Sequence, residues 1–143
     1  MVSYRPSLLL VSVLMASSAA GEDTISVVLR PPYRPGFPVI VRCHFEYIGS
    51  EIETLASLKL ERSVGGYPPN YRSVATVTPD DEINEIGGQA TVVGEIDPGY
   101  EAFVSVRFPD ANAYCFNYKC TATGRNKQGQ SKSIEHTERS PCA

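Results

Sequence analysis

The sequence contains no tryptophan and, after its first 20 residues, no long uninterrupted apolar run. A membrane-spanning helix needs about 20 consecutive apolar residues, so we expect no membrane span. The chain also has no run rich in lysine and arginine, the usual sequence mark of a segment that neutralises nucleic acid phosphates. It lacks any Asn-x-Ser/Thr site for N-glycosylation as well. These absences argue against an integral membrane protein and against a nucleic acid partner.

Residues 1–20 have the composition of a secretory signal peptide. Arg5 gives the positive start, residues 8–16 form a short apolar core, and residues 17–20 are the small side chains of a cleavage site. Cleavage before Gly21 would leave 123 residues with 12 basic and 16 acidic side chains, because Arg5 is the one charged residue removed. This length suits one domain, so we expect a secreted, extracellular, acidic single domain over residues 21–143.

The four cysteines are Cys43, Cys115, Cys120 and Cys142. An even number of cysteines in a secreted chain favours two disulfides, since the compartment is oxidising. A structural zinc site would instead need closely spaced ligand pairs, and no C-x2-C motif occurs. The two histidines also stand at no typical ligand interval. We therefore expect disulfides and no metal or other cofactor.

Apolar residues alternate with period two in several short segments, and no segment shows a sustained helical period. Clusters of glycine, proline, asparagine and aspartate separate these segments. The acidic stretch 80–85, followed by two glycines, has turn composition. Because one alternating sheet must bury its apolar face against another, the pattern predicts an all-β, two-sheet sandwich. About eight strands are expected, over 24–30, 39–47, 54–62, 72–78, 89–96, 100–108, 114–123 and 131–138.

Alternation also predicts which way individual side chains point. In 39–47 the odd positions are apolar or aromatic, which turns Cys43 inward and His44 outward. In 54–62 the set Ala56, Leu58 and Leu60 shares one face. In 100–108 the even positions form the apolar face.

The same argument predicts the cysteine pairing. In 114–123, Cys120 shares the apolar parity and Cys115 has the other, so an inward Cys120 would meet an inward Cys43 across the core. A hairpin centred on 126–129 pairs residues whose numbers sum to about 255, which places Cys115 near Cys142. The competing connectivity, Cys43 with Cys115 and Cys120 with Cys142, would need Cys115 to face inward.

With these residues the chain resembles an immunoglobulin-like domain of intermediate or variable type, with Greek-key connections. Cys43 and Cys120 stand at the B- and F-strand positions, Tyr118 matches the tyrosine two residues before the second cysteine, and Asn126 and Gly129 match the F–G turn. The stretches 55–63 and 94–98 are similar to single-domain secreted proteins of molluscs and related invertebrates. The family's usual core tryptophan is missing, and we expect Leu58 to fill its place.

Catalysis and calcium binding are the two sharper chemical hypotheses, and neither is favoured. His44 is expected on an outward strand position and His136 near the chain end, outside any catalytic motif, so we expect no enzyme activity. The acidic stretch 80–85 lacks the spaced D-x-D-x-D-G pattern of a dedicated calcium loop, so solvated surface is the simpler interpretation.

Recognition of an extracellular protein or glycan is the function that the resemblance implies. The aromatic and proline segment 67–71, with Tyr67 and Tyr71, has the composition of a contact surface, although its prolines could simply shape a turn. The F–G loop offers Arg125, Asn126 and Lys127. Defence, reproductive secretion or the extracellular matrix would each fit such a module. A structural or mineral-associated matrix protein is the alternative function.

Overall fold

The computed structural model describes residues 24–30, 37–47, 51–63, 68–97, 101–109, 111–140 and 142. The expected signal peptide, its cleavage site and Tyr67 lie outside the described residues. The elements are β1 (Thr24–Arg30), β2 (Val39–Glu46), β3 (Thr54–Ser63), β4 (Arg72–Val77), β5 (Glu82–Asn84), β6 (Thr91–Asp97), β7 (Glu101–Phe108), the 3-10 helix η1 (Ala111–Cys115), β8 (Asn117–Arg125) and β9 (Ser131–Glu138). Within these ranges, no helix has the length and apolar character that a membrane crossing requires.

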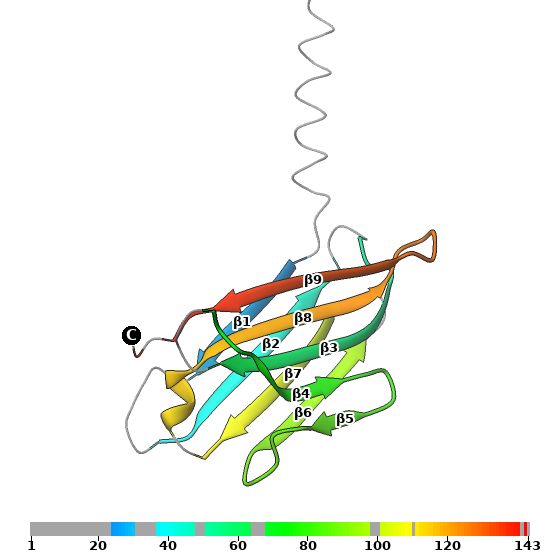
Figure 1. Cartoon of the computed structure of the whole chain (residues 1–143). Helices are drawn as coiled ribbons and strands as arrows, with labels where there is room; N and C mark the ends of the chain where they lie inside the picture. The colour runs from blue at the N-terminus through cyan, green and yellow to red at the C-terminus, as the bar shows by residue number, and fades with distance from the viewer. Residues whose placement is uncertain are drawn as a thin grey trace, which may run out of the picture.

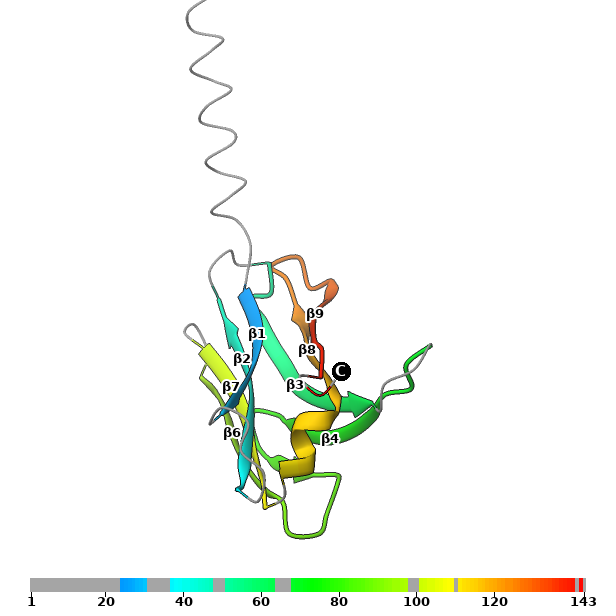
Figure 2. The ribbon, with the colours of Figure 1, turned by 90° about the vertical axis from the view of Figure 1, so that its left-hand side faces the viewer.

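The strands form two antiparallel sheets that pack face to face (Figures 1 and 2). One sheet has the order β1-β2-β7-β6 and the other the order β5-β4-β3-β8-β9. The chain crosses between the sheets after β2, after β5 and after β7. This confirms the all-β, two-sheet sandwich predicted from the alternation.

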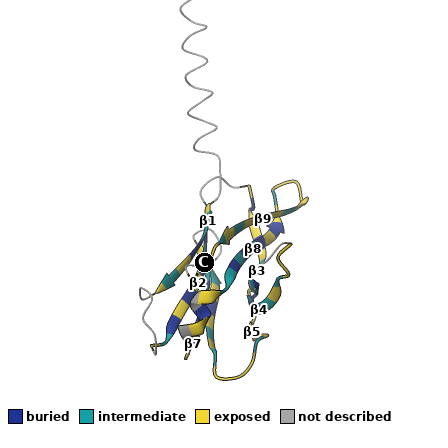
Figure 3. Cartoon of the chain, turned by 60° about the vertical axis from the view of Figure 1, so that its left-hand side comes forward, coloured by how far each residue is buried: buried dark blue, intermediate teal, exposed yellow. Residues whose placement is uncertain are grey.

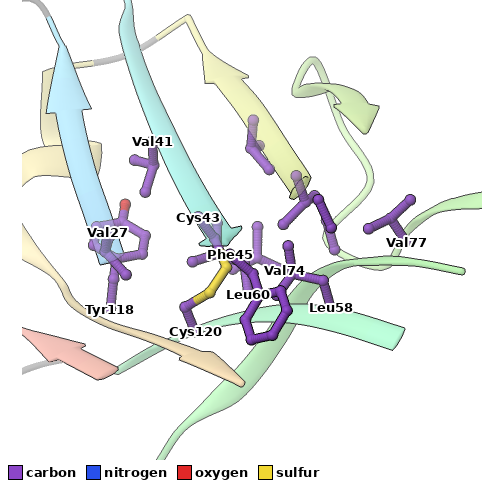
Figure 4. Close-up of a cluster of buried hydrophobic side chains, with 14 of the residues drawn as sticks. Val27, Val41, Cys43, Phe45, Leu58, Leu60, Val74, Val77, Tyr118 and Cys120 are labelled. Carbon is purple, nitrogen blue, oxygen red and sulfur yellow. A yellow bond between two sulfur atoms is a disulfide. The ribbon is translucent and has the colours of Figure 1, made fainter. Parts of the chain in front are cut away.

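The core lies between the two inner faces, and alternation places its side chains there. In β2 the burial alternates along the strand, with Val39, Val41, Cys43 and Phe45 fully buried. Figure 4 shows Cys43 and Phe45 of this row meeting side chains of the opposite sheet, among them Leu58, Leu60 and Cys120. Figure 3 shows the same alternation of buried and exposed residues along the strands. Leu58 is fully buried, as expected for the residue that replaces a core tryptophan.

Both predicted disulfides are present. Cys43 and Cys120 join β2 to β8 across the core, with their Cα atoms 5.8 Å apart (Figure 4). Cys115 and Cys142 are joined with their Cα atoms 5.1 Å apart. The pairing of Cys115 with Cys142, predicted from the hairpin register, is confirmed, but the strand parity that was to turn Cys115 away from the core does not apply. Cys115 ends the helix η1 rather than lying in a strand, so strand alternation does not set its direction.

Two further details differ from the sequence prediction. Ala56 is exposed and Leu55 is buried, because a register irregularity between Leu55 and Ser57 shifts the alternation at the start of β3. The acidic stretch 80–85 is not only a turn, since it contains β5, a strand additional to the eight expected. β5 forms because its backbone pairs with the edge of β4, although all three of its side chains are exposed.

Tyr118 anchors the start of β8 to the preceding helix, η1. Its side chain is fully buried, and its hydroxyl donates a hydrogen bond of 2.5 Å to the carbonyl oxygen of Ala113 in η1. This is the upstream backbone contact expected of the matched family tyrosine. Burial raises the pKa of Tyr118 to about 12, and the nearby Arg62 guanidinium offsets part of that increase. The Arg62 guanidinium also lies 4.0 Å from the Phe116 ring centre.

Replacing Tyr118 with phenylalanine should lower the free energy of unfolding by about 1–3 kcal/mol, because a buried carbonyl loses its donor. The folded-state pKa of Tyr118 is raised above the ordinary value of 10.0, so the folded chain holds this proton more tightly than the unfolded chain. The group's contribution is therefore complete below pH 10 and falls as pH rises through about 12. Urea titrations across pH 8–12 should show this alkaline loss in the native chain and a shallower loss in Tyr118→Phe. Equal slopes would contradict the assignment.

Candidate functional site

The turn between β8 and β9 is built around Asn126. Its side-chain oxygen accepts hydrogen bonds from the backbone nitrogens of Gln128, at 3.0 Å, and Gln130, at 2.9 Å. Its amide nitrogen donates to the Gln130 side chain at 2.9 Å. Gly129 completes the turn with φ of 78°, a conformation that side chains other than glycine rarely adopt. The turn is therefore held in one shape by its own residues.

The three predicted binding residues of this turn have different roles. Asn126 is occupied by the hydrogen bonds that shape the loop. Arg125 donates from Nη1 to the carbonyl oxygen of Gly129, at 3.1 Å, and is otherwise exposed. Lys127 is exposed at the tip and makes no hydrogen bond or ion pair with another described residue. Lys127 is thus the cation of this loop that remains open to a partner.

Tyr71 lies at the opposite end of the same sheet. The Lys119 ammonium sits 4.5 Å from the centre of its ring, and the same ammonium is 3.7 Å from a carboxylate oxygen of Glu61. Tyr71 precedes β4, next to the start of β8, whereas Arg125 ends β8. Six residues of extended strand separate Lys119 from Arg125, or about 20 Å. The predicted binding residues therefore form two separate groups, and Figure 1 shows the turn beyond β8 at the far end of the sheet from the start of β4.

His44, Glu46 and Glu101 form a cluster that sequence spacing did not reveal. His44 Nε2 lies 2.8 Å from a Glu101 carboxylate oxygen, and Nδ1 lies 3.6 Å from one of Glu46. Glu46 and Glu101 are direct cross-strand partners, a like-charge pair that is unfavourable without a cation nearby. One ligand atom from each of the three lies within 4.8 Å of the others, so the group could hold a divalent cation.

The acidic stretch 80–85 is shaped by local hydrogen bonds. The backbone nitrogens of Asp80 and Asp81 donate to the Thr78 hydroxyl, and the Thr76 hydroxyl donates to Glu85 at 2.5 Å. A hollow of about 470 Å³ lies between this turn and β6, lined by Asp80, Asp81, Glu82 and Glu95 among others. Among the described residues, the ligand atoms of His44, Glu46 and Glu101 lie close enough together to hold a metal ion. Those of the acidic stretch 80–85 do not.

The two histidines lie in different sheets. His44 faces outward from β2, as predicted, and is half-buried. His136 lies on the edge strand β9, where Nε2 is 3.3 Å from a Glu138 carboxylate oxygen. The two imidazoles therefore do not converge on one site.

The order of the strands decides the architecture. β1, β2, β7 and β6 correspond to A, B, E and D of an immunoglobulin domain, and β9, β8, β3, β4 and β5 to G, F, C, C′ and C″. The fold is immunoglobulin-like. The presence of C′ and C″ gives the nine-strand set of the variable type rather than the seven strands of the constant type.

Comparison with known proteins supports the fold and goes no further. No family model matches the sequence, and no curated protein matches it. Among solved structures, that of murine CRIg is similar with a TM-score of 0.54 and 10% sequence identity, covering 82% of this chain and 94% of that chain. At that identity the likeness shows a shared fold alone. The resemblance to secreted mollusc proteins stays a prediction.

Proposed function

We propose that the protein is a secreted, non-catalytic recognition or adhesion module that binds an extracellular protein or glycan through its F–G end. The observation that carries this proposal is the F–G turn itself. Asn126 holds the loop in one conformation, and Lys127 projects from it without a partner among the described residues. A loop ordered before binding loses less conformational entropy in the complex, which favours affinity.

Secretion is supported by two independent features. The signal-like composition of residues 1–20 precedes the folded part, and all four cysteines are paired in disulfides, as is usual for chains that mature in an oxidising compartment. Expression of the full 143-residue chain in a eukaryotic secretory host should release a product whose first residue is Gly21. Retention of the product inside the cell with residues 1–20 intact would contradict secretion.

Affinity capture from extracellular fluid of the source tissue, with the secreted product immobilised, tests recognition. Lys127→Glu reverses the open charge, Asn126→Ala removes the hydrogen bonds that order the loop, and Arg139→Glu is the matched control at the other end of β9. A partner that uses the F–G end should bind the first two variants at least threefold more weakly and the control as well as the native chain. If no partner is retained, or if all three variants lose it equally, the proposal fails.

The alternative function is a structural matrix component, and the acidic hollow beside the β4–β5 turn is the observation that favours it. A matrix role predicts that the protein is found in the insoluble extracellular fraction and is released only when the mineral or network dissolves. Recovery from soluble body fluid alone would argue for the recognition module instead.

A further inference from the structure

The outer face of the β1-β2-β7-β6 sheet carries arginines that are far apart in the sequence. Cross-strand pairing places Ile40 between Arg30 on β1 and Arg107 on β7. Arg42 lies two residues further along β2, on the same face. Neighbouring strands are about 4.8 Å apart and alternate residues about 6.7 Å apart, so the three arginines start within about 10 Å of one another. We call Arg30, Arg42 and Arg107 the arginine patch.

The patch has no direct ion-pair partner among the described residues. No ion pair joins any of its three members to a carboxylate there, and all three are exposed. Arg42 is held in place by Phe103, whose ring centre lies 4.1 Å from its guanidinium carbon. The chain as a whole has a formal net charge of −3, so a local cluster of three positive side chains is opposite in sign to the net charge of the protein. Three unpaired cations on one small surface favour the approach of an anion.

The patch borders a groove with a volume of about 430 Å³. Arg30 and Arg42 line it, together with the exposed apolar side chains of Val28 and Ile40. Ser26, Ser105 and His44 also line it, and His44 Nε2 lies 2.8 Å from a Glu101 carboxylate oxygen at the far end of the groove. Figure 2 shows that no described strand or helix lies over this face of the sheet. The groove therefore combines oxyanion-binding guanidinium groups, hydroxyls and a small apolar floor.

The opposite end of this face is acidic. Beyond the patch, pairing places His44 beside Phe103, and the next row carries Glu46 opposite Glu101. A nucleic acid long enough to cover the face would bring phosphates against these carboxylates, which disfavours that class of partner. A ligand lying across the strands along the row of Arg30, Ile40 and Arg107 would be separated by three intervening residues of β7 from the row of His44, Phe103 and Glu95. It would therefore lie nearer to the arginines than to the carboxylates. This distribution of charge therefore favours a short anionic ligand, bound at the arginine end of the face.

We propose that the arginine patch and its groove bind an acidic polysaccharide, through sulfate or carboxylate groups on its sugars. Arginine binds such planar or tetrahedral oxyanions with paired hydrogen bonds. The sugar ring offers an apolar face for Val28 and Ile40 and hydroxyls for the two serines. The proposal rests on the recognition function above and names a second surface for it. That surface lies on the opposite sheet from the F–G turn. It also lies at the opposite end, because Arg30 ends β1 and Figure 1 shows the end of β1 far from the turn between β8 and β9.

Calorimetry with the secreted product and defined oligosaccharides tests the proposal. A heparin octasaccharide carries sulfates, a hyaluronan octasaccharide carries carboxylates alone, and a neutral dextran oligomer carries neither. The native chain should bind at least one of the two acidic sugars, with affinity that falls as salt is raised, and should not bind dextran. The acidic sugar that binds more tightly identifies the anionic group. Failure of both, or equal binding of dextran, would overturn the proposal.

Matched charge variants locate the site. Arg42→Gln with Arg107→Gln should weaken binding of the acidic sugar at least tenfold. Arg72→Gln with Arg139→Gln removes the same charge from two exposed positions outside the patch and the F–G turn, and should change binding less than twofold. Arg42→Lys with Arg107→Lys keeps the charge but loses the paired hydrogen bonds, and should recover binding only in part. Unchanged unfolding midpoints would show that the exposed substitutions leave the fold intact.

Two outcomes separate this proposal from other interpretations. If both double glutamine variants weaken binding equally, the interaction is general charge attraction and the site assignment is wrong. If polyglutamate of equal charge binds as tightly as the sugar, the patch binds acidic peptides and the polysaccharide class is wrong. Suppose that a partner is captured whose binding Lys127→Glu weakens, and that no acidic sugar binds in calorimetry. The assignment of the arginine patch would then be wrong, and the proposed recognition function would still hold.

Discussion

Replacing Cys43 and Cys120 together with alanine should lower the free energy of unfolding by about 4.5 kcal/mol or more. The bridge closes a loop of 77 residues, and restriction of the unfolded chain by such a loop is worth about that amount. Both cysteines are also fully buried, so their removal leaves a cavity between the sheets. A domain of this size has a total stability of about 5–15 kcal/mol, so the variant should be close to unfolding at 37 °C.

The second bridge provides the matched control. Cys115 and Cys142 are separated by 27 residues and both are exposed, so the Cys115→Ser, Cys142→Ser variant should lose about 3.5 kcal/mol and create no core cavity. Urea denaturation of the native chain and both variants measures the difference. The core variant should be less stable than the outer variant by at least about 1 kcal/mol. The reverse order would mean that the inter-sheet bridge is not the main covalent constraint on this fold.

Alternation within strands made much of the fold predictable. Each odd-numbered position from Val39 to Phe45 on β2 is buried, and so is the even-numbered set on β7. The facing of Cys43 and Cys120 followed, because period two leaves one choice of face once the apolar side is known. The hairpin register was also nearly right: Lys119 pairs with Thr137, one position from the expected sum.

The errors arose where backbone pairing overrides side-chain pattern. At the start of β3 a register shift buries Leu55 and exposes Ala56, and no local composition marks that shift. In β5 the side chains are all exposed, so nothing in their pattern indicates a strand, and the pairing with β4 alone defines it. Around Cys115 a 3-10 helix stands where the alternation was extended too far toward the N-terminus.

The functional surfaces show the same limit. The Asn-x-x-Gly spacing identified the F–G turn, but only the hydrogen bonds show that Asn126 shapes the loop and Lys127 is left open. The arginine patch could not be seen in the sequence, because Arg30 and Arg107 become neighbours only through the pairing of β1 and β7 with β2. Cross-strand register is the information that a single sequence lacks for such sites.

Phe45→Ala should lower the free energy of unfolding by about 3–5 kcal/mol, the usual cost of emptying a buried phenylalanine site. With no tryptophan in the chain, Phe45 and Tyr118 are the two largest of the fully buried side chains in the described core. The Phe45 ring also makes an edge contact with Tyr47, with ring centres 4.9 Å apart. Since β2 is a central strand that carries Cys43 and pairs on both sides, the surrounding backbone has little freedom to collapse into the cavity.

Phe37→Ala is the control for the same change of side chain at an exposed position. Phe37 is 55% exposed, so its removal should change stability by less than about 0.5 kcal/mol. Thermal and urea unfolding of both variants, compared with the native chain, measure the two costs under one set of conditions. Similar losses for the two variants would show that the core does not depend on Phe45. A large loss for Phe45→Ala alone would show that the packing between the two sheets depends on this ring, in a core that contains no tryptophan.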